Sequence, residues 1–149
     1  MIYIAHRGNT NGPNPDKENH PDYLRAAVRK GYDVELDVWL ISGKYILGHD
    51  APQYEVEDYF LDNSHFWCHA KNLEAITALV DPGFPVHTFF HDADACTLTS
   101  QKWIWTYPGY PVLGHRSIAV MPERAPGIDL SRAGGICTDF PVDFQLGKR

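Results

Sequence analysis

The sequence is poor in cysteine and has no long apolar run. Its three cysteines, Cys68, Cys96 and Cys137, lie far apart and form no CxxC pair, so we interpret them as thiols that serve as small apolar residues in a reducing compartment. A cytoplasmic protein is expected on this ground. No stretch approaches the roughly 18 apolar residues of a membrane-spanning helix, and the first residues do not resemble a signal peptide. We therefore expect no stable membrane insertion.

Positive charge is also scarce. The chain has 13 Lys and Arg against 19 Asp and Glu, a net charge of −6 with its 8 histidines neutral. Nucleic-acid binding depends on cations that neutralise phosphates, and no Lys- or Arg-rich run is present, so nucleic acid is not an expected partner. One or two local cations would still hold a small phosphate-bearing molecule. The 149 residues, 44% of them hydrophobic, predict one domain with one core.

Short apolar runs, several of them bounded by glycine, proline or asparagine, predict β-strands. The predicted strands are Ile2–Ala5, Val34–Leu40, Tyr45–Leu47, Phe66–Ala70, Val86–Phe90, Trp103–Thr106, Ile118–Met121 and Gly135–Thr138. Helices are predicted at Asp22–Lys30 and, after the N-cap residue Asn72, at Leu73–Val80, which ends before Pro82. Tyr54–Leu61 predicts one or two short helical turns. This alternation favours an α/β fold with a parallel core, although the later connections are too short for full helices.

Polar residues gather at the ends of these predicted strands. His6-Arg7-Gly8 ends the first strand, where glycine admits a ligand close to the backbone and the arginine fork suits two phosphate oxygens. Glu35 and Asp37 lie two residues apart and therefore share one strand face. Two carboxylates directed into an apolar core need a cation, and a hard divalent metal supplies it. An exposed strand face with both acids in water remains the alternative.

Two further strand ends carry residues suited to acid–base chemistry or phosphate binding. His49-Asp50 has the form of a general acid or base with an orienting neighbour. His69 and Lys71 share one face of the next strand, where the lysine would balance the two carboxylates and hold a phosphate oxygen. Strand ends of this kind are where α/β barrels build their sites.

The order of these motifs resembles the glycerophosphodiester phosphodiesterase family, within the phospholipase-C-like phosphodiesterase barrels. The matching segments are His6-Arg7-Gly8, Glu18-Asn19, Gly31–Asp37 and His49-Asp50, followed later by Trp105-Thr106 and Gly135–Pro141. The resemblance implies a single phosphodiesterase-like domain over residues 1–149, of the α/β class. Its fold would be a reduced (β/α)8 TIM-type barrel with several outer helices missing or shortened. The implied activity is metal-dependent hydrolysis of a small phosphodiester of the glycerophosphodiester type.

The resemblance also implies a role for each site residue. Glu35 and Asp37 would bind a divalent metal, Mg²⁺ or Ca²⁺, with Mn²⁺ as a further option. His6 and His49 would form the acid–base pair. The phosphate and the rest of the substrate would be contacted by Arg7, Lys71 and Trp105.

One position departs from the family pattern. The third strand of the family carries a glutamate that binds the metal, and this chain has His69 at that position. Histidine is neutral and softer, so a site that uses it would accept Mn²⁺ or Zn²⁺ better than Ca²⁺. A water molecule, or an acid from Asp92, Asp94 or Glu123, is the alternative to His69 as a ligand. His87 and His91, with Asp92 and Asp94, would form either a second metal cluster or structural parts of a loop.

Two other functions remain open from the sequence. One is a non-catalytic protein that binds phosphate ligands, which the histidine at position 69 favours. The other is a lyase-type reaction in which a substrate hydroxyl closes a cyclic phosphate without water. Missing outer helices would also expose apolar strand faces. We expect either a homodimer or an aromatic-rich layer from Phe84–Pro111 to cover them.

Overall fold

The computed structural model describes residues 1–81 and 83–149 and is built on one ten-stranded sheet. The strands are β1 (Ile2–His6), β2 (Asp33–Ile41), β3 (Lys44–Leu47), β4 (Tyr54–Val56), β5 (Phe66–Ala70), β6 (His87–Phe89), β7 (Cys96–Leu98), β8 (Ile104–Thr106), β9 (Ser117–Val120) and β10 (Gly135–Thr138). The helices are α1 (Pro21–Arg29), α2 (Leu73–Leu79) and α3 (Pro141–Gln145), with short 3₁₀ helices η1 (Asp58–Leu61) and η2 (Pro122–Arg124).

The predicted strands and helices are confirmed to within a residue or two at their ends. Asn72 caps α2 as expected, since its side-chain oxygen accepts a hydrogen bond from the backbone N–H of Ala75 at 3.1 Å. Pro82, expected to follow that helix, lies outside the described residues. The prediction for Tyr54–Leu61 is wrong in its first half, because Tyr54–Val56 pairs with β3 as an antiparallel strand.

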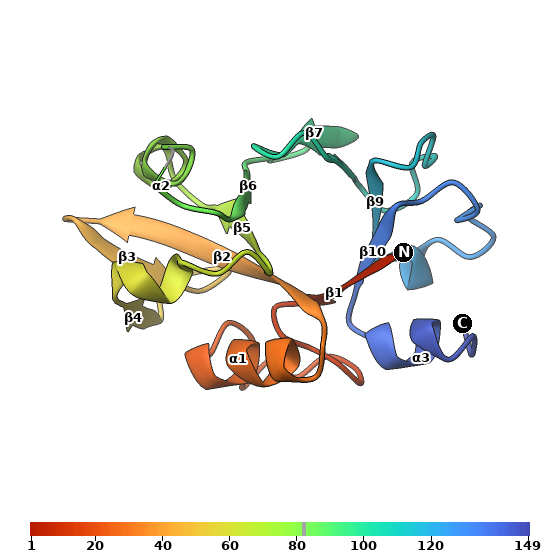
Figure 1. Cartoon of the computed structure of the whole chain (residues 1–149), viewed down its shortest axis with the longest axis horizontal. Coiled ribbons are helices and arrows are strands. Elements are labelled where there is room, and N and C mark those ends of the chain that lie inside the picture. The colour runs from red at the N-terminus through yellow and green to blue at the C-terminus, as the bar shows by residue number, and fades with distance from the viewer. Residues whose placement is uncertain (82) are drawn as a thin grey trace.

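The sheet is curled and open (Figure 1). Strands β6, β5, β2, β1, β10, β9 and β8 lie side by side in that order and run parallel. Strands β3 and β4 extend β2 in the antiparallel sense, and β7 pairs antiparallel with β8. In the described part of the chain, no backbone ladder joins β6 to β8. The sheet is therefore a half-barrel with mixed strand directions.

The expectation of a reduced (β/α)8 TIM-type barrel is wrong. That fold closes eight parallel strands and follows each with a helix, whereas this sheet is open and mixed, and its described residues form three short helices. The connections after β8 and β9 explain part of the difference. They contain Pro108, Pro111, Pro122 and Pro126, and proline inside a helix removes a hydrogen bond and clashes with the preceding turn.

Side chains alternate between the two faces of the sheet. On the outer face, Val34, Leu36 and Val38 of β2 belong to a buried cluster with residues of α1 and α2, and the helices lie outside the curl in Figure 1. A second cluster fills the inner face with Ile4, Trp67, Phe89, Trp105, Ile118 and Cys137. Because the pleat has a period of two residues, Glu35 and Asp37 are directed to the inner face.

Aromatic side chains pack between β6 and β8, which do not pair with each other in the described part of the chain. The rings of Phe89 and Trp105 stack with centroids 4.5 Å apart. The aromatic residues expected to form an outer layer thus contribute to the inner core. Phe90 and Ile104, by contrast, are 48% and 41% exposed, and the homodimer that would cover such side chains stays a prediction. Within the residues described, no helix is long and apolar enough to span a bilayer.

Gly8 allows the end of β1 to pack closely against α1. Its φ is +87°, and a Cβ there would lie 2.9 Å from Cδ1 of Tyr23 and 3.3 Å from Cδ2 of Leu24. We expect Gly8→Ala to lower the free energy of unfolding by about 3 kcal/mol, because it combines left-handed strain with overpacking. Urea unfolding measures this loss.

Gly43 provides the matched control for that substitution. It also has a positive φ, +77°, but nothing lies within 4 Å of its Cβ position. Gly43→Ala should therefore show only the backbone cost of about 1 kcal/mol. Equal losses in the two variants would show that the contact with α1 is not what requires glycine at position 8.

Candidate functional site

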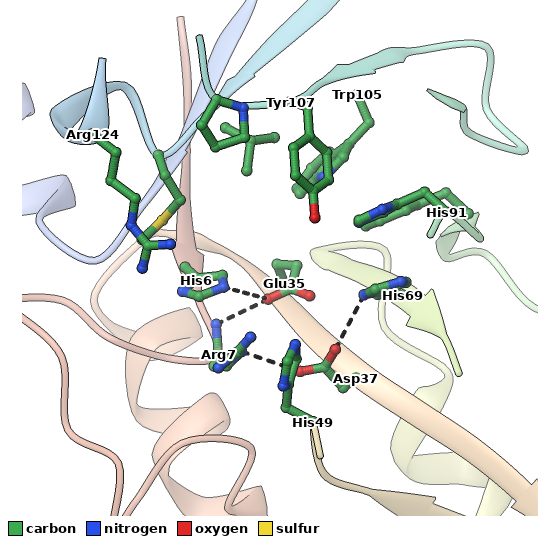
Figure 2. Close-up of a pocket in the computed structure, with 14 residues that line it drawn as sticks. His6, Arg7, Glu35, Asp37, His49, His69, His91, Trp105, Tyr107 and Arg124 are labelled. Carbon is green, nitrogen blue, oxygen red and sulfur yellow. Dashed lines mark hydrogen bonds and ion pairs between the residues drawn. The ribbon is translucent and has the colours of Figure 1, made fainter. Parts of the chain in front are cut away.

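Three neighbouring parallel strands bring the predicted site residues together. In the register of β1 and β2, His6 lies opposite Glu35, and in the register of β2 and β5, Asp37 lies opposite His69. Opposed residues of neighbouring strands direct their side chains to the same face of a sheet. The four side chains line a pocket of about 290 Å³ on the inner face (Figure 2).

The pocket contains most of the residues that the sequence analysis assigned to the site. Its lining includes His6, Arg7, Glu35, Asp37, His49, His69 and Trp105. Lys71 does not line the pocket, and its Nζ lies 3.5 Å from Oδ1 of Asp37. The two acids of β2 are buried, with Glu35 3% and Asp37 0% exposed, which excludes the alternative of an exposed acidic strand face.

Asp37 is the most heavily contacted group of the site. Its carboxylate lies 3.3 Å from Nε of Arg7 and 3.1 Å from Nδ1 of His69, and its Oδ2 accepts a 2.9 Å hydrogen bond from the amide of Asn19. Burial alone would raise the pKa of Asp37. The contact with His69 and the charges of Arg7 and Lys71 outweigh burial and hold that pKa well below its usual range. Asp37 is therefore ionised.

The pKa of Glu35 is shifted in the opposite direction to that of Asp37. Burial, and then the charge of nearby Asp37, raise the pKa of Glu35 above its ordinary value. Its Oε2 accepts a hydrogen bond from the backbone N–H of Arg7 at 3.2 Å. Burial and the neighbouring carboxylate of Asp37 thus both disfavour a second negative charge at Glu35.

The residues present fit a divalent cation. One potential ligand atom from each of Glu35, Asp37 and His69 lies within 4.8 Å of the others. Oδ1 of Asp37 is buried and lacks a hydrogen bond of acceptable geometry, even though His69 is close. Two carboxylates and one imidazole suit Mn²⁺ or Zn²⁺ as well as the harder Mg²⁺ and Ca²⁺.

The alternative acids do not join this group. Asp92 and Asp94 are exposed, and Oε1 of Glu123 instead accepts hydrogen bonds from Oγ1 of Thr138 at 2.8 Å and from the backbone N–H of Asp139 at 3.2 Å. Among the residues that the structure describes, no second group of three ligands occurs. The cluster of His87, His91, Asp92 and Asp94 considered from the sequence is therefore not formed.

Asp139 orients His6. Its Oδ1 lies 2.8 Å from Nδ1 of the imidazole, which leaves Nε2 on the pocket side, 3.9 Å from Oε2 of Glu35. Burial lowers the pKa of His6, but the hydrogen bond with Asp139 and the charge of Glu35 outweigh it, so that the pKa is raised. The sequence analysis recorded Asp139 only within a motif and missed this role. Its position directly after the last strand was the available signal.

Arg7 is held by the segment that follows it. Its Nη1 lies 3.1 Å from Oε2 of Glu18, so the Glu18-Asn19 motif orients Arg7. Asn9 continues the network, since its amide donates to Oε1 of Glu18 at 2.9 Å and to Oδ1 of Asp139 at 2.8 Å. Arg7 has a φ of 51°, a strained conformation that these contacts maintain.

His49 lies at the rim of the pocket, in the loop between β3 and β4. Its side chain is 38% exposed, and its Nδ1 lies 2.7 Å from Oδ1 of Asp50. A Cβ on Gly48 would overlap the carbonyl oxygen of Ala51. Nε1 of Trp39 donates a 2.7 Å hydrogen bond to the carbonyl of Gly48. The loop is thereby fixed against β2.

Aromatic side chains form the wall opposite His49. Trp105 lines the pocket and is 2% exposed, while Tyr107 stands edge-on to His91 with ring centroids 4.7 Å apart. His91 stacks on His69 at 4.4 Å. Burial, and then the charge of His69, lower the pKa of His91 to about 4. His91 and Tyr107 were not predicted as site residues, because they follow β6 and β8 and meet His69 only through the fold.

Comparisons of the chain with protein-family models, with curated proteins and with solved structures find no match. The interpretation of the pocket therefore depends on the order of the motifs and on the geometry of the site. Side chains from positions 6, 7, 35, 37 and 49 line one pocket, and Glu18 and Asn19 hold Arg7 and Asp37 from outside it.

Proposed function

We propose that the protein is a metal-dependent phosphodiesterase that hydrolyses a small phosphodiester of the glycerophosphodiester type. The observation that carries this proposal is one pocket in which the oriented imidazole of His6 faces the buried group of Glu35, Asp37 and His69 (Figure 2). Those three residues would hold a divalent metal, which supplies positive charge to a phosphate whose negative charge grows in the transition state.

The two histidines provide the proton transfers. Because Asp139 engages Nδ1 of His6, Nε2 is the atom available to the substrate, an arrangement that fixes the tautomer of a catalytic imidazole. One of His6 and His49 takes a proton from the attacking water as the new P–O bond forms. The other donates a proton to the alkoxide as the old P–O bond breaks. Arg7 adds positive charge beside the reacting phosphate.

We further propose a relationship to the glycerophosphodiester phosphodiesterases. It is supported by the order of the motifs and by the way their residues converge on β1, β2 and the loop after β3. The open sheet retains the strands that carry these motifs. His69 in place of the family glutamate favours Mn²⁺ or Zn²⁺ among the metals that such a site accepts.

A non-catalytic phosphate-binding protein is the second candidate. The observation that favours it is that two cations, Arg7 and Lys71, already lie within 3.5 Å of the carboxylate of Asp37. In such a site these two cations, rather than a metal, would balance the charge of Asp37. Binding of phosphate ligands with neither metal affinity nor turnover would favour this candidate over the enzyme.

A phosphodiester screen tests the proposed activity. Bis(p-nitrophenyl) phosphate and glycerophosphodiesters would be incubated with the protein and Mg²⁺, Ca²⁺ or Mn²⁺, and the products read by phosphorus-31 NMR after removal of the metal. Hydrolysis gives a phosphomonoester, whereas lyase-type chemistry gives a cyclic phosphate. No product from any substrate with any of the three metals would contradict the proposal.

Asp139→Asn should lower kcat about 10- to 100-fold and leave KM nearly unchanged. The asparagine has nearly the same shape but no charge, so it would no longer fix the tautomer and orientation of His6. Asp129→Asn is the matched control, because Asp129 is exposed, does not line the pocket, and accepts a hydrogen bond from the backbone N–H of Ser131. A kcat for Asp139→Asn equal to that of the control would show that Asp139 has no positioning role.

A further inference from the structure

Arg7 and Lys71, the two cations predicted from the sequence to bind phosphate, both lie close to carboxylates. Arg7 lies between Glu18, 3.1 Å from its Nη1, and Asp37, 3.3 Å from its Nε. Lys71 lies 3.5 Å from the same Asp37 and does not line the pocket. A cation whose charge is already balanced attracts a second anion less strongly. A positively charged side chain other than Arg7 and Lys71 would therefore bind phosphate more strongly.

Arg124 has the properties of that group. It lines the pocket from the end of η2, and Figure 2 shows its guanidinium directed toward His6. Its side chain is exposed and forms neither an ion pair nor a hydrogen bond with any residue that the structure describes. Its charge contributes to the lowered pKa of Asp139, after the larger effects of burial, which opposes the shift, and of His6 and Asn9. Arg124 thus lies near His6, and no described residue forms an ion pair with its guanidinium.

The backbone before Arg124 is firmly anchored. Met121 adopts a left-handed conformation with a φ of 47°, and its N–H donates a 2.7 Å hydrogen bond to the carbonyl of Cys137. Glu123 is fixed by Thr138 and by the backbone of Asp139. Strained backbone that many contacts maintain is typical of functional sites. These contacts place Arg124 beside the carboxyl end of β10.

We propose that Arg124 binds the phosphate of the substrate, across the pocket from Glu35, Asp37 and His69. This inference rests on the proposed function for the identity of the substrate. A guanidinium offers two parallel N–H donors to two phosphate oxygens, and such charge-assisted pairs are among the strongest hydrogen bonds in proteins. A phosphodiester in the pocket would meet Arg124 on one side and the carboxylate–histidine group on the other.

Phosphorus-31 NMR of inorganic phosphate, titrated with the full chain in the presence of Mg²⁺, measures this binding without any turnover. We expect Arg124→Ala to weaken phosphate binding about tenfold or more, and Arg124→Lys to give an intermediate loss because lysine keeps the charge but not the fork. Arg132→Ala is the control, since Arg132 is exposed and lines a separate depression formed by residues 109–113, 125–129 and 132. It should bind phosphate as the unchanged chain does.

The outcomes separate this inference from the proposed function. Loss of phosphate binding in Arg124→Ala would support phosphate binding by Arg124. If the unchanged chain also fails to hydrolyse phosphodiesters, the proposed phosphodiesterase activity would be refuted. Hydrolysis with phosphate binding and KM both unaltered in Arg124→Ala would overturn the role of Arg124 and leave the enzyme standing. Failure of the unchanged chain to bind phosphate at millimolar concentration would overturn the inference as well.

Discussion

Replacing either His6 or His49 with alanine is expected to reduce hydrolysis of bis(p-nitrophenyl) phosphate by about 100- to 10,000-fold. Each histidine is assigned one of two proton transfers, and a positioned acid or base contributes rate factors of that size. The loss should appear in kcat, because neither imidazole is assigned to hold the phosphate. His6→Ala should show the larger loss, since the side chain of His6 is 14% exposed and that of His49 is 38% exposed.

His115→Ala is the control for this experiment. His115 is exposed, lies in the connection between β8 and β9, and does not line the pocket. Its substitution should leave kcat and KM unchanged. Thermal unfolding of all three variants shows whether a loss of activity reflects a loss of folded protein. Full activity in both His6→Ala and His49→Ala would refute the assignment of the acid–base pair.

Glu35→Gln is expected to abolish the stabilisation of the protein by metal without lowering the stability of the metal-free protein. In the metal-free protein the substitution should leave the unfolding free energy unchanged or raise it, because it removes a buried charge that lies beside Asp37. Metal at about 100 times its dissociation constant should stabilise the unchanged chain by about 2.7 kcal/mol. The Glu35→Gln variant should show almost none of this gain, since one of the two carboxylate ligands is lost.

Differential scanning calorimetry with and without Mn²⁺ measures both effects of Glu35→Gln. Glu57→Gln is the matched control, because Glu57 is an exposed acid outside the pocket and its substitution should preserve the stabilisation by metal. A metal-induced increase in Tm for Glu35→Gln equal to that of the unchanged chain would show that Glu35 is not a ligand. The site would then have to be assigned elsewhere.

The site could be predicted from the sequence because the strands that carry it follow a simple period. Alternation on β2 placed Glu35 and Asp37 on one face, and the parallel register with β1 and β5 then brought His6 and His69 opposite them. Asp139 could not be paired with His6 in this way. The two residues are 133 positions apart and meet only because β10 returns to the edge of β1.

The shape of the sheet was the main feature that the sequence did not reveal. Whether β6 pairs with β8 depends on how the connection at residues 90–103, which contains β7, is placed, and short, irregular segments carry little periodic signal. In the described part of the chain, β6 and β8 are joined by the stacked rings of Phe89 and Trp105 and not by a backbone ladder. Arg124 was missed for a related reason, because a three-residue 3₁₀ helix leaves no pattern that identifies which side chain faces a pocket.

Turnover of bis(p-nitrophenyl) phosphate before and after removal of metal tests the central claim most directly. Protein treated with a chelator and then freed of it should show no hydrolysis, and addition of Mn²⁺, Mg²⁺ or Ca²⁺ should restore it in the unchanged chain but not in Glu35→Gln. Hydrolysis that survives chelation, or a chain that stays inactive with all three metals, would contradict a metal-dependent phosphodiesterase built on Glu35, Asp37 and His69.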